Sequence, residues 1–461
     1  MKRPLALVLV VVVAAGAVAL VARFDRERQY RALLAQGEQA SRDGNAWGAI
    51  EAFSGALVLR PDSMVSFYRR GLAYRDQGHD EQAIRDWKDA HRLAPDAPEP
   101  LVALAELYDR REQPSLAAAR YAEAAELLKD EDPALLYALG LARYRSGAPA
   151  AAIDPLHRAV ARHDGLAPAH HLLGLAYRDV GNLDAAIASL DRAIRLDRKL
   201  IAAREELADL YRAVGRHGDE LQQLQALVQL DGQIDRRIAV ALAQARQRQF
   251  DAALAGLGAI AAEAPSDSRL YLALGRVHLA RAEALGDAAA IGQAREALEI
   301  ALGGTARRSE GLALLGRALY LAGDHDGALR ILQQAVATSP ADRHAFVYLA
   351  DAAERLQRHL LARDALLMAS ALQGSTATPE TRDARARRIG LLSLDGGDPT
   401  VAARFLRRAV DAGLADVSTL AAFARSQWET GERDGARATL ARAVALDRVH
   451  PDVVAASRVV R

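Results

Sequence analysis

The chain contains no cysteine among its 461 residues. This absence excludes disulfide bonds, zinc–thiolate sites, iron–sulfur clusters, thiol nucleophiles and a lipid-anchored cysteine. It does not indicate a compartment, because proteins of reducing and of oxidising compartments can both lack cysteine. Any catalytic or metal site would therefore have to be built from histidine, carboxylate or hydroxyl groups.

Neither sign of charge predominates, since 60 basic residues stand against 59 acidic ones and the net charge is +1. A nucleic-acid-binding domain usually shows a basic face or stripe, so no nucleic-acid partner is expected. Arginine supplies nearly all of the positive charge, and with the abundant alanine this composition is typical of a GC-rich genome. The lysines are Lys2, Lys88, Lys129 and Lys199.

Common catalytic and ligand-binding motifs are also missing. The sequence has no phosphate-binding loop, dinucleotide-binding glycine pattern, nucleophile-elbow serine, zinc-protease helix or calcium loop. His170 and His171 are adjacent, so on a helix they point about 100° apart and cannot easily share a metal. The segment 395–398 (DGGD) is interpreted as a turn. We therefore expect no catalytic, cofactor or metal residue, no small-molecule substrate and no enzymatic activity.

An uncharged apolar run occupies residues 4–22, behind Lys2 and Arg3. As a helix it would be about 28 Å long, which is close to the hydrocarbon thickness of a bilayer. The favoured interpretation is a retained transmembrane signal anchor. A cleaved signal peptide, with small residues at 15–17, and a purely structural helix are the alternatives.

The charges around this run do not agree on an orientation. Lys2 and Arg3 favour a cytoplasmic N-terminus, whereas the arginines just beyond the run favour the opposite arrangement. Because a short basic segment before an apolar core is the usual export signal, a single-pass inner-membrane protein with an extracytoplasmic body is expected, and a cytoplasmic body is the alternative. The opposing arginines are Arg23, Arg26, Arg28 and Arg31.

The remainder of the chain is internally repetitive. The segment 173–181 reads LGLAYRDVG and the segment 70–78 reads RGLAYRDQG. Both continue into Ala-Ile five residues after the second glycine, and both then place alanine seven residues later. This pattern resembles the tetratricopeptide repeat (TPR), a helical hairpin of about 34 residues. The resemblance identifies the chain as similar to bacterial membrane-anchored TPR proteins.

The resemblance covers residues 30–450 as about 12 copies, and residues 451–461 are expected to form a capping helix. Within each copy, apolar positions three or four apart line one face of each of two helices. Glycine or alanine at position 8 and alanine at position 20 let the two helices approach closely. The copies span 30–63, 64–97, 98–131, 133–166, 167–200, 201–234, 235–267, 268–308, 309–342, 343–376, 383–416 and 417–450.

The fold is thus expected to be all-α, a right-handed α-solenoid of TPR hairpins behind one transmembrane helix. Three irregularities are visible: Glu220 replaces the alanine of position 20, residues 281–293 lengthen one hairpin as an extended helix end with a longer loop, and 374–380 reads as a loop. The expected domains are 1–29 (cytoplasmic stub, anchor and juxtamembrane segment), a main array 30–376, a loop 377–382 and a C-terminal array 383–461.

In the TPR family, positions 2, 5, 9, 12 and 13 of the first helix usually face a concave groove that binds proteins or peptides. Tyrosine and arginine at these positions are typical binding anchors. The lysine and asparagine clamp of chaperone-binding TPR domains is not matched here. The residues expected in the groove are Tyr68, Leu72, Arg75, Asp76, Tyr137, Leu141, Tyr144, Arg145, His171, Leu175, Arg178 and Asp179.

The resemblance implies a protein-interaction scaffold held at the membrane by the N-terminal helix. Its expected partners are proteins or peptides of envelope assembly, export or polysaccharide machinery. The alternatives are a cytoplasm-facing, membrane-tethered regulatory adaptor and a targeting subunit for a separate glycosyltransferase.

Overall fold

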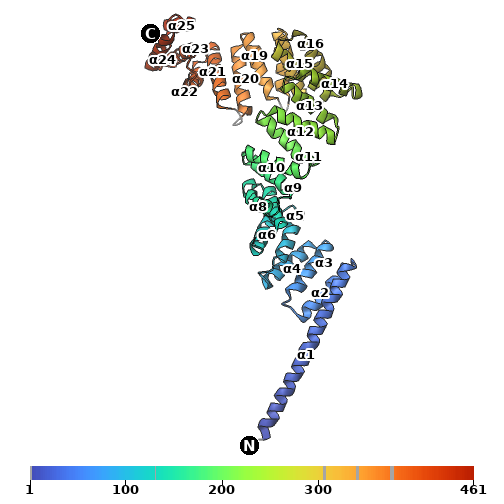
Figure 1. The fold of residues 1–461 in the computed structure, drawn as a ribbon. Helices are drawn as coiled ribbons and strands as arrows, with labels where there is room; N and C mark the ends of the chain where they lie inside the picture. The colour runs from blue at the N-terminus through green and yellow to red at the C-terminus, as the bar shows by residue number, and fades with distance from the viewer. Residues whose placement is uncertain (1–2, 130, 305–307, 339–341, 374–377) are drawn as a thin grey trace. The chain divides into compact units, whose positions relative to one another are not determined.

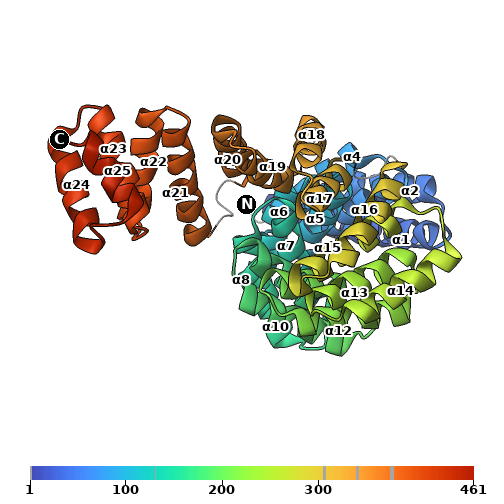
Figure 2. The same cartoon turned by 90° about the horizontal axis from the view of Figure 1, so that it is seen from above.

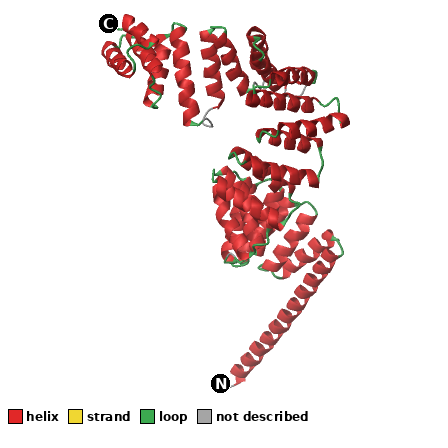
Figure 3. Ribbon diagram, turned by 45° about the horizontal axis from the view of Figure 1, so that its top comes forward, coloured by secondary structure: helices red, strands yellow, loops and turns green. Residues whose placement is uncertain are grey.

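The computed structural model describes residues 3–129, 131–304, 308–338, 342–373 and 378–461, and for residues 3–17 it describes the backbone only. The described residues form 25 helices and no strand (Figure 3). This confirms the expected all-α class. By its internal contacts the chain divides into two compact units, residues 1–216 and 217–461.

Unit 1 is built from helices that pack in sequence order, each against the next (Figure 1). Its helices are α1 (Arg3–Arg42), α2 (Ala46–Leu59), α3 (Met64–Asp76), α4 (Asp80–Leu93), α5 (Glu99–Arg110), α6 (Pro114–Leu127), α7 (Pro133–Arg145), α8 (Pro149–Arg162), α9 (Ala167–Asp179), α10 (Leu183–Leu196) and α11 (Ile201–Ala213).

Unit 2 follows the same plan, and its last helices can be followed in order in Figure 2. Its helices are α12 (His217–Leu230), α13 (Ile234–Arg246), α14 (Phe250–Glu263), α15 (Ser268–Leu285), α16 (Ala288–Leu302), α17 (Arg308–Leu321), α18 (His325–Ala337), α19 (Arg343–Arg355), α20 (His359–Gln373), α21 (Pro379–Asp395), α22 (Pro399–Asp411), α23 (Val417–Glu429), α24 (Arg433–Leu446) and α25 (Pro451–Val459).

Most hairpins close through a glycine on the first helix that faces a large side chain on the second. In the α9–α10 hairpin, a Cβ atom on Gly174 would lie 2.6 Å from Cγ of Leu190, which is closer than real Cβ contacts allow. Ala186, at position 20 of the same copy, is fully buried. The small residues therefore let the helix axes approach, as the repeat pattern predicts.

The turn inside each hairpin needs one residue in the left-handed region, where glycine has no steric penalty. Gly181 adopts this conformation, with φ +82°. The segment 395–398 is a turn of the same kind: Gly397 has φ +78°, and the carboxylate of Asp398 accepts a hydrogen bond from Val401 N at the start of α22. The interpretation of this segment as a turn is confirmed.

The lengthened hairpin of unit 2 has the expected extended helix end but not the expected longer loop. The extra residues extend the helices, so that α15 has 18 residues, and only Gly286 and Asp287 lie between α15 and α16. A long loop is therefore absent from this hairpin. Gly286 ends α15 in the left-handed conformation and Asp287 caps α16 through two backbone N–H groups, so two residues are enough for the reversal.

Glu220 is 1% exposed on α12, where the repeat expects alanine. The Arg246 guanidinium on α13 binds its carboxylate through both Nε and Nη2, and His217 Nδ1 lies 3.4 Å from Glu220 Oε2. A buried carboxylate requires such pairing, because desolvation strongly disfavours an isolated charge. In this copy the buried alanine of position 20 is thus replaced by a glutamate that is paired with Arg246.

The C-terminal cap is present as α25, which packs on α23 and α24. Val453 is buried there, whereas Val454 faces solvent. The residues 374–377 of the expected loop lie outside the described residues, and from Pro379 onward the expected loop is instead the start of α21.

The expected membrane-spanning anchor at 4–22 is not supported by the structure. The apolar run belongs to α1, a single 40-residue helix that continues without a break through Arg23, Arg26 and Arg28, and its C-terminal half packs on α2 (Figure 1). Crossing a bilayer requires about 20 predominantly apolar residues in a helix. Within the part of the chain that the structure describes, no helix meets that requirement. The predicted single-pass membrane localisation, with either orientation of the body, is contradicted by this finding.

Candidate partner-binding surface

The odd-numbered helices from α3 to α23 are the first helices of their hairpins, and they carry the residues expected in the groove. These twelve residues lie on α3, α7 and α9. The apolar and aromatic ones are half-buried and pack on the adjoining cores, as Leu72 and Tyr137 do. Asp76, Arg145 and Asp179 are exposed. Their charged groups are therefore available to solvent at the ends of the three helices.

Contacts between consecutive first helices join several of these residues. The Tyr144 hydroxyl on α7 donates a hydrogen bond to Asp179 Oδ2 on α9, at 2.7 Å. Arg178 binds Asp179 on its own helix and Glu206 on α11. Arg75, by contrast, forms its ion pair with its neighbour Asp76, at 2.8 Å. Tyr144 on α7 and Arg178 and Asp179 on α9 are thus held in position by these polar contacts.

A shallow hollow opens between α3, α5, α6 and α7, and we call it the α3–α7 hollow. It brings together Arg75 and Arg145, which the sequence predicts from two separate copies. Arg145 Nη1 lies 3.9 Å from Asp109 Oδ1, at the outer limit of an ion pair. The lining residues are Arg75, Glu106, Asp109, Arg110, Tyr121 and Arg145.

Three of the lining residues were missed although the repeat carries their signal. Glu106, Asp109 and Arg110 occupy positions 9, 12 and 13 of the copy 98–131, the same positions that were selected in neighbouring copies. Tyr121 comes from the second helix of the hairpin, which positions in the first helix do not indicate. It is buried at the base, where desolvation and the charges of Asp109 and Glu106 raise its pKa.

Burial also alters the titration of groups beside the predicted surface. Desolvation raises the pKa of Tyr144, and its hydrogen bond to Asp179 adds to the effect. Desolvation lowers the pKa of His171, and Glu206 opposes that shift. His170, next in the chain, points elsewhere, with Nε2 3.1 Å from the Asp164 carbonyl oxygen. The two histidines diverge, as their adjacency on a helix predicts.

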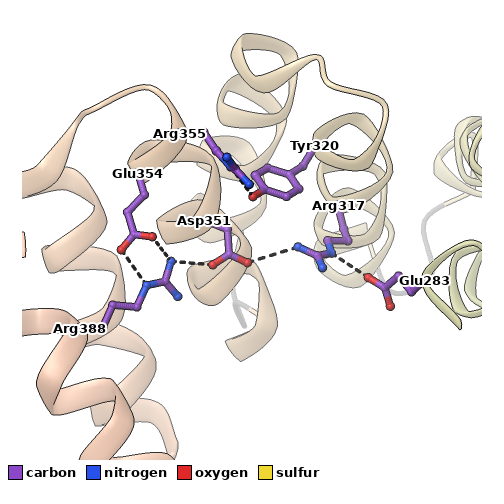
Figure 4. Close-up of polar contacts among 7 residues, drawn as sticks. All are labelled: Glu283, Arg317, Tyr320, Asp351, Glu354, Arg355 and Arg388. Carbon is purple, nitrogen blue, oxygen red and sulfur yellow. Dashed lines mark hydrogen bonds and ion pairs between the residues drawn. The ribbon is translucent and has the colours of Figure 1, made fainter. Parts of the chain in front are cut away.

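Unit 2 has a polar network along its first helices, shown in Figure 4. Arg317 on α17 binds Glu283 on α15 at 2.9 Å and Asp351 on α19 at 3.3 Å. Arg388 on α21 binds Asp351 at 2.7 Å and grips Glu354 with two hydrogen bonds of 2.6 and 2.7 Å. Four consecutive first helices are thereby linked by alternating charges.

Arginine charges in this network are well compensated. Burial would lower the pKa of Arg388, but its hydrogen bonds to Glu354 and Asp351 outweigh burial and raise it. The Arg317 guanidinium also lies 5.2 Å from the ring centre of Tyr320 and 5.3 Å from that of Tyr348, within cation–π range. A network so fully paired holds neighbouring helices in register.

A second hollow lies between α13 and α15, with an apolar floor and a charged rim. Arg269 on the rim is paired with Asp235 at 2.6 Å. The lining residues are Asp235, Ile238, Ala239, Leu242, Arg269, Leu272, Ala273 and Arg276. Throughout the described residues no group of three or more histidines and carboxylates is arranged to hold a metal ion.

Two stretches of the chain match family models described as tetratricopeptide repeat, residues 167–200 and 313–375. The first coincides with a copy predicted from the sequence, and the second falls within the copies 309–342 and 343–376. The chain therefore contains TPRs, and that part of the resemblance is confirmed. Proteins with TPRs are generally protein-interaction scaffolds. No curated protein matches the chain.

Several solved structures are similar to parts of the chain. YrrB, a TPR protein with an unusual peptide-binding site, is 19% identical, and the match covers 41% of this chain and 96% of YrrB with a TM-score of 0.38. Pseudomonas aeruginosa PilF is 20% identical, over 45% of this chain and 95% of PilF, with a TM-score of 0.34. MamA from Desulfovibrio magneticus RS-1 is 21% identical, over 37% and 97%, with a TM-score of 0.34.

Proposed function

We propose that the chain is a non-enzymatic scaffold that binds protein or peptide segments on the surface of its first helices, with the α3–α7 hollow as the primary site. The observation that carries this proposal is the convergence of Arg75 and Arg145, from α3 and α7, on one hollow with a tyrosine at its base. Arginine and tyrosine combine a large contact area with hydrogen-bonding groups, and both are enriched at binding hot spots.

The charges of the hollow favour a segment with polar or mixed-charge side chains. Arg110 and Arg145 present guanidinium groups, and Glu106 presents a carboxylate, all three exposed. The long Arg145–Asp109 contact can be replaced by a contact to a partner at little cost, because exposed ion pairs contribute only about 0–1 kcal/mol. Bound segments would extend from there along α7 and α9, past Tyr144 and Asp179.

The broader role inferred from sequence, in envelope assembly, export or polysaccharide machinery, depended on the membrane tether. So did the alternative of a tethered regulatory adaptor. Since the tether is not supported, we propose partner binding alone, without assigning it to a pathway.

Peptide selection on the purified full-length chain provides the test. We expect the selected peptides to bind the Arg145→Ala variant about tenfold more weakly than the wild type, a loss of about 1.4 kcal/mol. Arg92→Ala is the matched control, because Arg92 on α4 is exposed and, among the described residues, pairs only with Asp89 on the same helix. Fluorescence polarisation with labelled peptides measures both affinities, and equal affinity of the Arg145→Ala variant and the wild type would contradict the proposal.

A further inference from the structure

A pocket that is distinct from the α3–α7 hollow lies between α20, α21 and α22 of unit 2, and we call it the arginine pocket. Its volume is about 220 Å³. One liquid water occupies about 30 Å³, so the pocket can hold a small polar group together with several waters. The lining residues are Ser370, Arg382, Arg385, Ala386, Ile389, Phe405 and Arg408.

Arg385 is the half-buried centre of this pocket. Its Nη2 donates to the side-chain oxygen of Gln373 at 2.8 Å, and its Nη1 lies 3.4 Å from Ser370 Oγ. Both partners are neutral, and no carboxylate among the described residues pairs with Arg385. The guanidinium is therefore held in a fixed orientation while its charge stays uncompensated.

Arg388 lies one turn further along α21 and differs from Arg385, because its positive charge is compensated by carboxylates. Arg388 has two carboxylate partners, and its pKa is raised. Burial and the positive charge of Arg388 instead lower the pKa of Arg385. Every other arginine of the described chain with a resolved pKa shift has it raised by a hydrogen-bonding partner. The surroundings of Arg385 therefore favour the binding of an anion.

Two more arginines surround Arg385. Arg382, on the exposed side of α21, pairs with no carboxylate of the described residues, and Arg408 on α22 pairs with Asp383 at 3.2 Å. The pocket and its ion-pair partner Asp383 thus contribute three guanidinium groups and one carboxylate, which leaves an excess of two positive charges. Residues 374–377, the neighbouring part of the sequence, read GSTA and contain no acidic residue.

We infer that the arginine pocket binds a doubly negative oxyanion group carried by a partner polypeptide, either one phosphoryl group or two adjacent carboxylates. A phosphoryl group carries a charge of about −1.5 to −2 at neutral pH and accepts several hydrogen bonds, which matches the excess charge and the free N–H groups. Phe405, Ala386 and Ile389 supply an apolar wall for the chain that bears the anion. That the carrier is a polypeptide rests on the proposed scaffold function, whereas the anion site itself does not.

Titration of the full-length chain with inorganic phosphate tests the anion site alone. By isothermal titration calorimetry we expect saturable binding, weakened at least tenfold in Arg385→Ala and in Arg382→Ala. Arg382 is exposed, so its variant keeps the fold intact even if the loss of Arg385 disturbs it. Arg407→Ala is the control, because Arg407 also lies on α22 but pairs with Glu432. Absence of saturable phosphate binding, or equal binding by all variants, would overturn the inference.

Three peptides of otherwise identical sequence then identify the source of the anion. One carries phosphoserine, one carries two adjacent glutamates and one carries serines at the same positions. Arg385-dependent binding of the first alone assigns a phosphoryl group, and binding of both charged peptides assigns a general dianion. Equal binding of all three peptides contradicts the inference. If phosphate binds but neither charged peptide does, the result counts against a polypeptide carrier of the anion. The scaffold function is tested separately by Arg145→Ala, which changes the α3–α7 hollow and not the arginine pocket.

Discussion

Single residues decide how closely the two helices of each hairpin pack. Gly71, Gly140, Gly174 and Gly316 each face a tryptophan or leucine of the paired helix across a gap that no Cβ atom could occupy. The same positions are recognisable in the sequence, because a helix interior normally disfavours glycine. Their contacts could therefore be predicted from the repeat pattern.

Replacing one such glycine should destabilise the array, whereas replacing a glycine with open surroundings should not. We expect Gly174→Ala to lower the free energy of unfolding by about 1–3 kcal/mol, because the added methyl overpacks against Leu190. Gly256→Ala should raise it by about 0.5–1 kcal/mol through helix propensity, because Gly256 lies in the middle of α14 and an added Cβ atom would meet nothing within 4 Å. Urea unfolding followed by circular dichroism measures both changes, and the same sign for both variants would disprove this explanation of the hairpin contact.

His171 should make stability depend on pH. Burial lowers its pKa in the folded chain below the ordinary value of 6.5 that applies when unfolded. As the pH falls below about 6.5, the unfolded state therefore binds the proton first, and the free energy of unfolding decreases. Above that pH both states are neutral at this residue and it contributes no slope.

The check is urea unfolding at pH 7.5 and pH 5.5. We expect His171→Gln to lose less stability between the two values than the wild type does, while His163→Gln, at an exposed position, should behave like the wild type. A loss in His171→Gln as large as in the wild type would show that His171 is not responsible.

Only some residues of the candidate site could be predicted from their positions in the repeat. Arg75 and Arg145 could be predicted because they occupy groove positions of the repeat, and Glu106 would have followed from the same rule. Tyr121 could not, since it reaches the hollow from α6, a second helix. Tyr144 and Asp179 were both expected in the groove, but the hydrogen bond between them was not, because it depends on the packing of α7 against α9.

At the scale of helices, most boundaries follow from caps and turns that the sequence displays. Asn182 and Asp398 each accept a hydrogen bond from a backbone N–H at the start of α10 and α22, and Gly181 ends the preceding turn. The extra residues at 281–293 were predicted to extend a helix end and to lengthen the loop. The helix extension is confirmed, and the longer loop is wrong because Gly286 and Asp287 suffice for the reversal.

Ion pairs between consecutive first helices are the other element-scale feature, and only tertiary structure reveals them. Arg388 and Glu354 are 34 residues apart, one repeat length, so each helix offers its charge to the next. We expect the double-mutant cycle of Arg388→Ala and Glu354→Ala to give a coupling energy of about 1 kcal/mol, because the contact is bidentate and partly shielded from water.

The exposed pair Arg295 and Glu299 on α16 serves as the control cycle. Its contact is 3.7 Å between side chains that are more than half exposed, so coupling should stay below about 0.5 kcal/mol. Equal coupling energies from the two cycles, both measured by urea unfolding, would remove the argument that this network holds α19 and α21 in register.

For the molecule as a whole, the 34-residue period predicts nearest-neighbour packing through both units, and the all-helical fold follows from it. The N-terminal helix shows that the composition of a segment does not by itself predict a membrane span. A run of apolar residues long enough to suggest a membrane span is part of one helix that continues through charged residues and packs on α2. The sequence shows where the run ends but not that the helix continues beyond it into the first hairpin, because that continuation is stabilised by the packing of α1 on α2.

The central claim is that the α3–α7 hollow is where a partner polypeptide binds. Hydrogen–deuterium exchange of the full-length chain, with and without a peptide selected on it, tests this most directly. The account predicts that a peptide near its wild-type Kd slows exchange in α3, α5 and α7, and that Arg145→Ala strongly reduces this protection at the same peptide concentration. Protection confined to other helices, or protection of α3, α5 and α7 that is unchanged in Arg145→Ala, would contradict it.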